Sequence, residues 1–440
     1  MTSSIQGSGS DNVGRVEAGQ PVDPINAQFY SRFQYPWPPL FIRRLAEPGF
    51  ESDMLSQSVG EWVIDILPAG PRIWVAGCGT NQAVLTAVRF PAAQVLGTDI
   101  SMESLAASQR LAEQLGVTNL NLRAESINDA AYDGEFDYVI STGVIHHNAD
   151  PQATLSRISR ALKPDGLLEL MVYNRYHCIE ATAIQNAVRI LASAAGGSGF
   201  EGQLELAHEL MEGREDLKRR VGQFFVGMDR SEAALADALI QPVAYTFNVL
   251  ELQRLAAACG LDLLLPCVNQ FDVARNCFDW DVGMPDGVLR AAYETLGDTL
   301  RWQVINLVGQ DQSPMLWFYL RRVSSARPRR SEREIVDQFG DQVFEIAETS
   351  SRVFLRTEEG TYQPAGQLTR YPGRPPDETC HRIIGIVAER ERVRLRDVLA
   401  ELGISSDFTI LNRLRVRLTT TAFPYLSALA RNFGDVSACD

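Results

Sequence analysis

The sequence lacks the cysteine pattern of a metal-binding or disulfide-stabilised protein. Its seven cysteines are scattered over 440 residues and never form a CxxC pair. Paired cysteines at short spacing would indicate a zinc site, and an even set in a short secreted chain would indicate a disulfide framework. We therefore expect neither a metal site nor a disulfide framework.

Long apolar runs are also missing, since no stretch approaches the roughly 20 residues that a membrane-spanning helix needs. The first residues, MTSSIQGSGSDN, contain neither a basic nor an apolar segment, which argues against a secretion signal. We expect residues 1–25 to form a disordered polar arm. The absence of both signals predicts a cytoplasmic protein without a membrane partner.

Basic residues are too few to give the chain a positive balance. There are 41 Lys and Arg against 55 Asp and Glu, which gives a net charge of −14. General binding to nucleic acid phosphates requires clustered basic side chains, so this class of partner is not expected. One basic run lies between residues 321 and 330 around Pro328, and we interpret it as a solvated linker.

What the sequence contains is a regular alternation of strand and helix patterns. Short β-rich runs alternate with segments of helical periodicity, which predicts an α/β fold with a parallel sheet and right-handed crossovers. An amphipathic helix over residues 54–67 is expected to precede the first strand. The predicted strands are 72–79, 94–100, 120–125, 136–142 and 167–174, and the predicted helices between them are 82–90, 104–116 and 151–162.

The length of the chain favours two or three domains. Residues 26–41 combine aromatics with prolines, which predicts an ordered extended segment and not a regular helix. The predicted parts are a lid segment at 26–53, a cofactor-binding domain at 54–175, a helical insertion at 176–244, a return to the catalytic domain at 245–325, and a C-terminal accessory domain at 331–440.

The sequence after residue 176 also predicts individual helices and strands. Helices are expected over 178–193, 203–220 and 230–240, then a helix and a strand over 245–266 and another strand over 315–322. The two strands are candidates to join the main sheet. Three helical segments after residue 380 have the rhythm of a small winged-helix-like module.

The turn AGCGTN at 76–81 is the main candidate for a ligand site. Gly77 and Gly79 let a ligand approach backbone N–H groups at the start of a helix, and Asn81 can adopt a positive φ. Asp99 ends the second strand, 22 residues after Gly77, where a carboxylate can accept hydrogen bonds from both hydroxyls of a ribose. Position 82 is Gln instead of the third glycine of a dinucleotide fingerprint, which disfavours a nicotinamide cofactor.

Four segments, VAGCGTNQ, GTDIS, FDYVISTGVIHHNADP and LKPDGLLELMVYN, resemble the successive motifs of class I S-adenosylmethionine-dependent methyltransferases. The likeness covers residues 72–174. It implies a Rossmann-like sheet, methyl transfer, and S-adenosylmethionine as cofactor. By this resemblance the cofactor lies against the turn residues Ala76, Gly77, Cys78, Gly79 and Asn81, with Asp99 at the ribose, Ile100 on the adenine, Glu125, Ser126 and Ile127 at the adenine edge, and Thr142, Gly143 and Val144 below the sulfonium.

Methyl transfer is an in-line displacement at an activated carbon, so the protein mainly aligns the nucleophile and excludes water. An amine or hydroxyl acceptor must also lose a proton, and His146 or His147 is a candidate base, with a structural role as the alternative. Side chains that could border the acceptor are Tyr173 and Tyr176 after the fifth strand, and Tyr30, Tyr35 and Trp37 in the lid segment.

The predicted function is methyl transfer to an N, O or C nucleophile of a small molecule or a peptide of natural-product type, by a chain that could form a homodimer. A protein lysine is the alternative acceptor. Two hypotheses of other classes stay open, a nicotinamide-dependent oxidoreductase and a catalytically silent regulator that retains the cofactor fold. No metal ligand set is predicted, because the histidines and cysteines have no ligand-like spacing.

Overall fold

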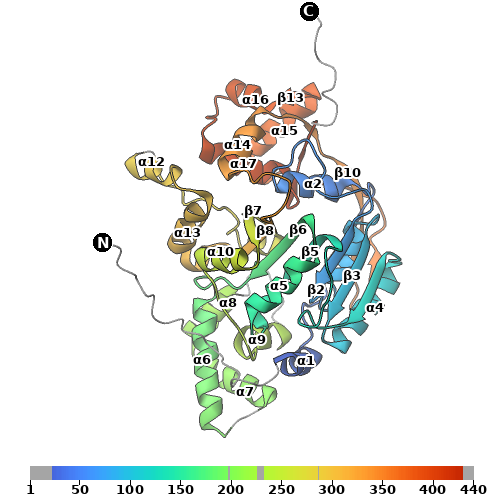
Figure 1. The fold of residues 1–440 in the computed structure, drawn as a ribbon, viewed down its shortest axis with the longest axis vertical. Coiled ribbons are helices and arrows are strands. Elements are labelled where there is room, and N and C mark those ends of the chain that lie inside the picture. The colour runs from blue at the N-terminus through green and yellow to red at the C-terminus, as the bar shows by residue number, and fades with distance from the viewer. Residues whose placement is uncertain (1–21, 197–198, 225–231, 286, 430–440) are drawn as a thin grey trace, which may run out of the picture.

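The computed structural model describes residues 22–196, 199–224, 232–285 and 287–429, and its centre is a seven-stranded sheet (Figure 1). The strand order is β4-β3-β2-β5-β6-β8-β7. The first five strands in this order run parallel, whereas β8 runs antiparallel to both of its neighbours. This confirms the predicted α/β fold. The strands are β2 (Arg72–Ala76), β3 (Gln94–Asp99), β4 (Leu120–Ala124), β5 (Phe136–Thr142), β6 (Leu162–Val172), β7 (Leu261–Pro266) and β8 (Leu316–Arg322).

The central strands are buried on both faces, as expected for a parallel sheet covered by helices. Residues 73–76 of β2 are fully buried, which explains why these four consecutive positions are apolar instead of alternating. Strand β6 begins earlier than the predicted strand 167–174, because residues 162–166 already belong to it. An irregularity between Phe136 and Tyr138 accommodates the longer pairing.

Helices α3 (Gln82–Arg89), α4 (Met102–Leu115) and α5 (Pro151–Ala161) connect the parallel strands where the periodicity predicts them. The side chain of Asp150 caps α5 by accepting the N–H of Ala153 at 2.9 Å. The left-handed Gly116 ends α4, with φ +62°. Local capping chemistry therefore sets the start of α5 and the end of α4.

The predicted return to the main sheet is confirmed. Helix α10 (Val249–Ala258) leads into β7, and β8 lies between β7 and β6. The connection from β7 to β8 contains helices that the sequence patterns do not predict: α11 (Gln270–Ala274), α12 (Val288–Glu294), α13 (Asp298–Gly309) and the short η2 (Gln310–Gln312).

The helical insertion lies beyond the carboxyl ends of the strands (Figure 1). The segment predicted as one helix over 203–220 is two helices, because Gly213 adopts φ +71° and turns the chain between them. None of the helices in the described ranges is both long and apolar enough to cross a bilayer. The insertion consists of α6 (Ile179–Ala194), α7 (Phe200–Met211), α8 (Glu215–Phe224) and α9 (Glu232–Leu239).

The N-terminal segment differs from its prediction. Residues 22–32 form helix α1 (Val22–Arg32), although 22–25 were expected to be disordered and 26–41 extended. Pro24 falls in the first turn of α1, where a backbone N–H has no helical partner to lose. Phe29 and Phe33 are buried against the helical insertion, so tertiary packing stabilises α1. Residues 1–21 of the predicted arm lie outside the described residues.

The helix predicted over 54–67 is also displaced. Helix α2 (Phe50–Ser58) ends before Gly60, which adopts φ +77°. A Cβ at this glycine would lie 2.5 Å from a methyl group of Ile335, so the chain turns here in close contact with the C-terminal region. Strand β1 (Phe41–Leu45), from the predicted lid segment, pairs antiparallel with β10 (Thr349–Arg356) of that region, with Phe41 opposite Leu355.

The C-terminal region contains the three predicted helices as α15, α16 and α17, of which α17 packs against α2 (Figure 1). Strands β13, β9 and β15 form a small sheet, and β10 pairs with β1, β11 and β12 in a second one. The elements are α14 (Glu332–Asp341), β9 (Val343–Ile346), β10 (Thr349–Arg356), β11 (Tyr362–Pro364), β12 (Thr369–Tyr371), α15 (Glu378–Arg390), β13 (Val393–Arg394), α16 (Leu395–Glu401), α17 (Phe408–Thr419), β14 (Phe423–Pro424) and β15 (Leu426–Ala428).

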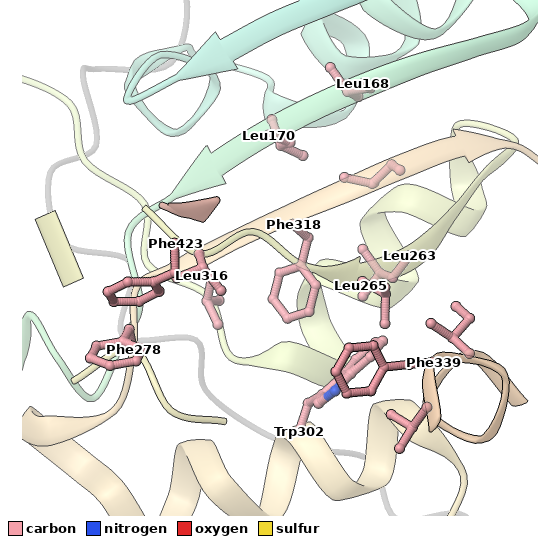
Figure 2. Close-up of a cluster of buried hydrophobic side chains, with 14 of the residues drawn as sticks. Leu168, Leu170, Leu263, Leu265, Phe278, Trp302, Leu316, Phe318, Phe339 and Phe423 are labelled. Atoms are coloured by element: carbon pink, nitrogen blue, oxygen red, sulfur yellow. The ribbon is translucent and has the colours of Figure 1, made fainter. Parts of the chain in front are cut away.

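One hydrophobic core joins this region to the main sheet. Figure 2 shows Phe318 of β8 beside Trp302 of α13 and Phe339 of α14, and all three belong to one buried cluster. The ring centroids of Trp302 and Phe318 are 5.2 Å apart.

The basic run between residues 321 and 330 is also ordered, since Arg330 pairs with Glu61 at 2.8 Å and Arg329 with Asp262 at 3.0 Å. Its interpretation as a solvated linker was therefore wrong.

Candidate active site

A cavity of about 350 Å³ opens at the carboxyl ends of the parallel strands, between the sheet, α1 and α9. In a doubly wound sheet this is the expected place for a ligand, where the strand order reverses beside β2. The cavity brings together all but one of the predicted cofactor residues. They are Gly77, Cys78, Gly79, Asn81, Asp99, Ile100, Glu125, Ser126, Ile127, Thr142, Gly143 and Val144.

The exception is Ala76. Its side chain is fully buried in the main hydrophobic core and does not line the cavity. The residue ends β2, and the alternation of a strand directs its Cβ into the core while the next residues turn toward the ligand space. Ala76 is therefore a packing residue and not a cavity residue.

The glycine turn requires glycine for two separate reasons. Gly77 and Gly79 adopt φ of +75° and +54°, which side chains disfavour. A Cβ at Gly77 would also lie 2.6 Å from Val144, and one at Gly79 would lie 2.4 Å from the carbonyl oxygen of Tyr35. Asn81 does not take the predicted positive φ but has φ −151°, and its side chain donates to the carbonyl oxygen of Trp37 at 3.0 Å.

Asp99 is held at the end of β3 by backbone donors. Its two carboxylate oxygens accept the N–H of Gly79 at 2.8 Å and the N–H of Ser101 at 2.9 Å. Burial raises the pKa of Asp99, and these N–H donors oppose the shift. Each oxygen retains capacity for a second hydrogen bond, so the carboxylate can still accept from a ligand.

The N-terminal segment covers the cavity through specific contacts. Asp23 of α1 accepts a hydrogen bond from Ser126, and Asn26 donates to the carbonyl oxygen of His147 at 2.7 Å. After α1, Thr80 donates to the carbonyl oxygen of Pro36. Tyr30, Tyr35 and Trp37 all line the cavity, as the lid prediction expected.

The two candidate histidines have different environments. His147 lines the cavity, and its Nδ1 lies 2.6 Å from the carbonyl oxygen of Val243. A carbonyl can only accept, so Nδ1 carries the proton and Nε2 is left as an acceptor. Burial lowers the pKa of His147. His147 therefore has the protonation state that a base requires.

His146 cannot be the base. It is fully buried, does not line the cavity, and neither ring nitrogen has a hydrogen-bond partner among the described residues. Burial lowers its pKa well below the usual value. Its ring centroid lies 4.0 Å from that of Tyr173, so His146 packs behind a cavity residue.

Tyr176 is a second correction. It follows β6, as expected, but does not line the cavity. Its backbone N–H donates to the side-chain oxygen of Asn174 at 3.1 Å, within a turn that directs the residue away from the site. Tyr173, three residues earlier, does line the cavity.

The residue that sequence reasoning missed is Asp237 of α9. It is 7% exposed and lines the cavity. Its carboxylate accepts hydrogen bonds from the hydroxyls of Tyr30 at 3.0 Å and Tyr173 at 2.9 Å. No motif surrounds this aspartate in the sequence, and only the tertiary fold brings α1, β6 and α9 together. Phe271, Met315 and Trp317, which also line the cavity, gave no local signal either.

Among the described residues, the cavity wall has neither the environment of a reactive cysteine nor the ligand set of a metal site. Burial raises the pKa of the Cys78 thiol well above its usual value, which disfavours the reactive thiolate. Within the ranges that the structure covers, no three His, Cys, Asp or Glu side chains group as a metal site would require.

Comparison with known sequences points to one class of enzyme. A methyltransferase-domain family model matches residues 74–168. An uncharacterized protein of a Synechococcus species is 26% identical over 288 residues, covering 62% of this chain and 66% of that protein. The ubiquinone biosynthesis O-methyltransferase of Rhodopseudomonas palustris is 30% identical over 194 residues, covering 39% of this chain and 72% of that protein. The chain spans about half the length of the Cereibacter sphaeroides and Bradyrhizobium enzymes with the same description.

Among solved structures, PKMT2 from Rickettsia typhi in complex with AdoHcy has the same fold over most of the chain. The TM-score is 0.55 at 16% identity, and the match covers 89% of this chain and 77% of that chain. At this identity the likeness establishes the fold alone. It extends well beyond the cofactor-binding sheet.

Proposed function

We propose that this chain, which belongs to the class I S-adenosylmethionine-dependent methyltransferases, transfers the methyl group of that cofactor to an acceptor held beneath α1 and α9. The observation that carries the proposal is that one cavity contains two separate groups of polar residues. The glycine turn and Asp99 line one part of the wall, and a hydrogen-bonded group of Tyr30, Asp237 and Tyr173 lines another. A cofactor and an acceptor can therefore meet in one enclosed space.

The first wall fits an adenosyl group. The free lone pairs of the Asp99 carboxylate suit two ribose hydroxyls, and Ile100 and Ile127 offer apolar surface for the adenine. The bare backbone at Gly77 and Gly79 leaves room for the methionine part. A cavity of about 350 Å³ lies within the range that binds ligands of this size.

When bound, S-adenosylmethionine supplies an electrophilic methyl carbon on a sulfonium that leaves as a neutral thioether. The residues of this chain align the nucleophile and exclude water. Helix α1 and the segment of Tyr35 and Trp37 cover the cavity, and in this proposal Nε2 of His147, the ring nitrogen without a proton, accepts the proton of an N–H or O–H acceptor.

The proposed acceptor is a small molecule or a peptide of natural-product type. The match to the Rhodopseudomonas enzyme covers 39% of this chain, so its hydroxyl chemistry is not assigned to this protein. A protein lysine is the second candidate. Lysine must be deprotonated from a pKa near 10.4, and desolvation in a buried aromatic cavity favours the neutral amine.

The test combines binding and turnover. The full chain is incubated with S-adenosylmethionine labelled on the methyl group and an extract of the cells from which the protein comes, and labelled products are identified by mass. We expect stabilisation by S-adenosylhomocysteine, none by NAD, and a labelled product that is lost with Asp99→Ala. Stabilisation by NAD alone would indicate the oxidoreductase, and binding without any product would indicate the silent regulator.

A further inference from the structure

The cavity residues proposed to hold the acceptor, Tyr30, Asp237 and Tyr173, include a buried carboxylate that forms no ion pair among the described residues. Asp237 is 7% exposed, and within the described residues no Lys or Arg lies within ion-pair distance of it. Its partners are two neutral tyrosine hydroxyls. A buried carboxylate is costly unless it is hydrogen-bonded and paired, so the site is arranged for a positive group that the chain itself does not supply.

The charged residues that line the rest of the cavity are also acidic. Among its described lining residues there are four carboxylates, of Asp23, Asp99, Glu125 and Asp237, and no Lys or Arg. An anionic acceptor, such as a carboxylate or a phosphate ester, would meet repulsion and find no basic partner. A cationic acceptor is attracted, and so is the sulfonium of the cofactor.

Aromatic rings complete the surroundings of Asp237. Tyr30 and Tyr173 contact it through their hydroxyls, and Tyr35 and Trp37 line the same cavity with ring centroids 5.5 Å apart in an edge-to-face arrangement. Aromatic faces attract ammonium groups through their quadrupoles, by about 2 kcal/mol when desolvated. A carboxylate beside several aromatic rings is the chemistry that binds an alkylammonium ion.

We propose that the methyl acceptor is an amine, which binds as its ammonium ion against Asp237 and the surrounding aromatic rings. This inference rests on the proposed methyltransferase function and names its acceptor group. The ammonium loses one proton to Nε2 of His147, from which the proton passes to solvent. The nitrogen lone pair then forms the new N–C bond as the C–S bond breaks, which yields a methylammonium product and a neutral thioether.

Two sources can supply such an amine, a side chain of a protein or a small molecule. One experiment distinguishes them and tests the acceptor class. Half of the cell extract is treated with N-hydroxysuccinimide acetate to block amines, then with hydroxylamine to free hydroxyls, and both halves are methylated with the labelled cofactor. Each half is separated by size before counting.

We expect blocking to reduce the incorporated label at least tenfold, with the label in the large fraction for a protein amine and in the small fraction for a free amine. Label that persists after blocking would overturn the proposal, because the acceptor would then be a hydroxyl or a carbon. An extract that accepts no label, while the chain binds S-adenosylhomocysteine, would instead contradict the methyltransferase function on which the inference rests.

The role of Asp237 is tested with Asp237→Asn, and the surface change Glu113→Gln on α4 is its matched control. We expect Asp237→Asn to lower methylation of the unblocked extract at least 100-fold while the calorimetric affinity for S-adenosylhomocysteine changes less than threefold. If methylation and the affinity for S-adenosylhomocysteine fell by the same factor, Asp237 would instead bind the ammonium group of the cofactor, and the assignment would be overturned. Unchanged methylation would also overturn it. The control should leave both quantities at the wild-type level.

Discussion

Substituting Gly79 by alanine tests whether the segment of Tyr35 and Trp37 closes over the cofactor. The Cβ of Gly79→Ala would lie 2.4 Å from the carbonyl oxygen of Tyr35 and 2.7 Å from a ring carbon of Pro36. Neither atom belongs to a flexible side-chain end, so the covering segment must move away from the glycine turn. The positive φ of +54° adds strain of about 1 kcal/mol.

The loss in cofactor affinity follows from the displaced contacts. If the movement removes roughly 60 Å² of apolar contact with the ligand, at about 25 cal/mol per Å² the loss is about 1.5 kcal/mol. That corresponds to about tenfold weaker binding. The unliganded protein should lose about 1 kcal/mol of stability from the backbone strain, and more from the contacts of the segment that the new Cβ displaces.

The matched control is Gly116→Ala at the end of α4. Gly116 has a similar φ of +62°, and its Cβ would meet nothing within 4 Å. By thermal unfolding Gly116→Ala should therefore lose about 1 kcal/mol and Gly79→Ala more than that, and only Gly79→Ala should bind S-adenosylhomocysteine more weakly by calorimetry. Equal affinity in the two variants would refute the role of the segment as a cover.

Three further substitutions probe the site and the fold. Asp99→Ala removes the acceptor of two ribose hydroxyls, each worth about 1.5 to 3 kcal/mol, so calorimetry should show at least about 100-fold weaker binding of S-adenosylhomocysteine. Burial raises the pKa of Asp272 to about 7, so the stability contributed by its neutral form is complete below about pH 4 and is lost as the pH rises to about 7. Only wild type loses this stability as the pH rises. The difference in unfolding free energy between Asp272→Asn and wild type should therefore shift by about 2 to 3 kcal/mol in favour of the variant between pH 5 and pH 8. Arg301→Met removes the buried cation that pairs with the carboxylates of both Asp298 and Glu332, which keep only Arg329 and Arg415 as cationic partners among the described residues, and should cost about 3 kcal/mol in denaturant unfolding.

Each of these expectations has a contrary outcome. Near-normal affinity in Asp99→Ala would contradict the ribose contact. A constant stability difference between wild type and Asp272→Asn across the pH range would mean that Asp272 does not titrate there. For Arg301, the control is Arg390→Met, which breaks a half-exposed pair with Glu401 and should cost less than about 1 kcal/mol. Similar losses in the two variants would contradict the importance of the buried cluster.

The cofactor half of the site could be predicted from sequence because its determinants are local. A glycine turn after one strand and an acid at the end of the next lie within 23 residues, and a parallel sheet places both at one edge. Ala76 was the error within this half. The alternation of β2 determines which way its side chain points, and the turn motif alone does not show this.

The acceptor half could not be predicted, because it is assembled from segments far apart in the chain. Tyr30 and Asp237 are separated by 207 positions, and no periodicity indicates that their helices meet. Helix α1 was missed for a related reason. The prolines at 36, 38 and 39 dominate the local pattern, whereas the burial of Phe29 and Phe33 by distant helices decides that the preceding residues are helical. The homodimer, the domain boundaries and the roles of the individual site residues stay predictions.

The central claim is that the glycine turn and Asp99 bind an adenosyl sulfonium. Isothermal titration of the full wild-type chain with S-adenosylhomocysteine tests it most directly. The structure predicts saturable binding of one molecule per chain, with no comparable heat from NAD. Folded protein that gives no heat of binding with S-adenosylhomocysteine or S-adenosylmethionine would contradict the claim.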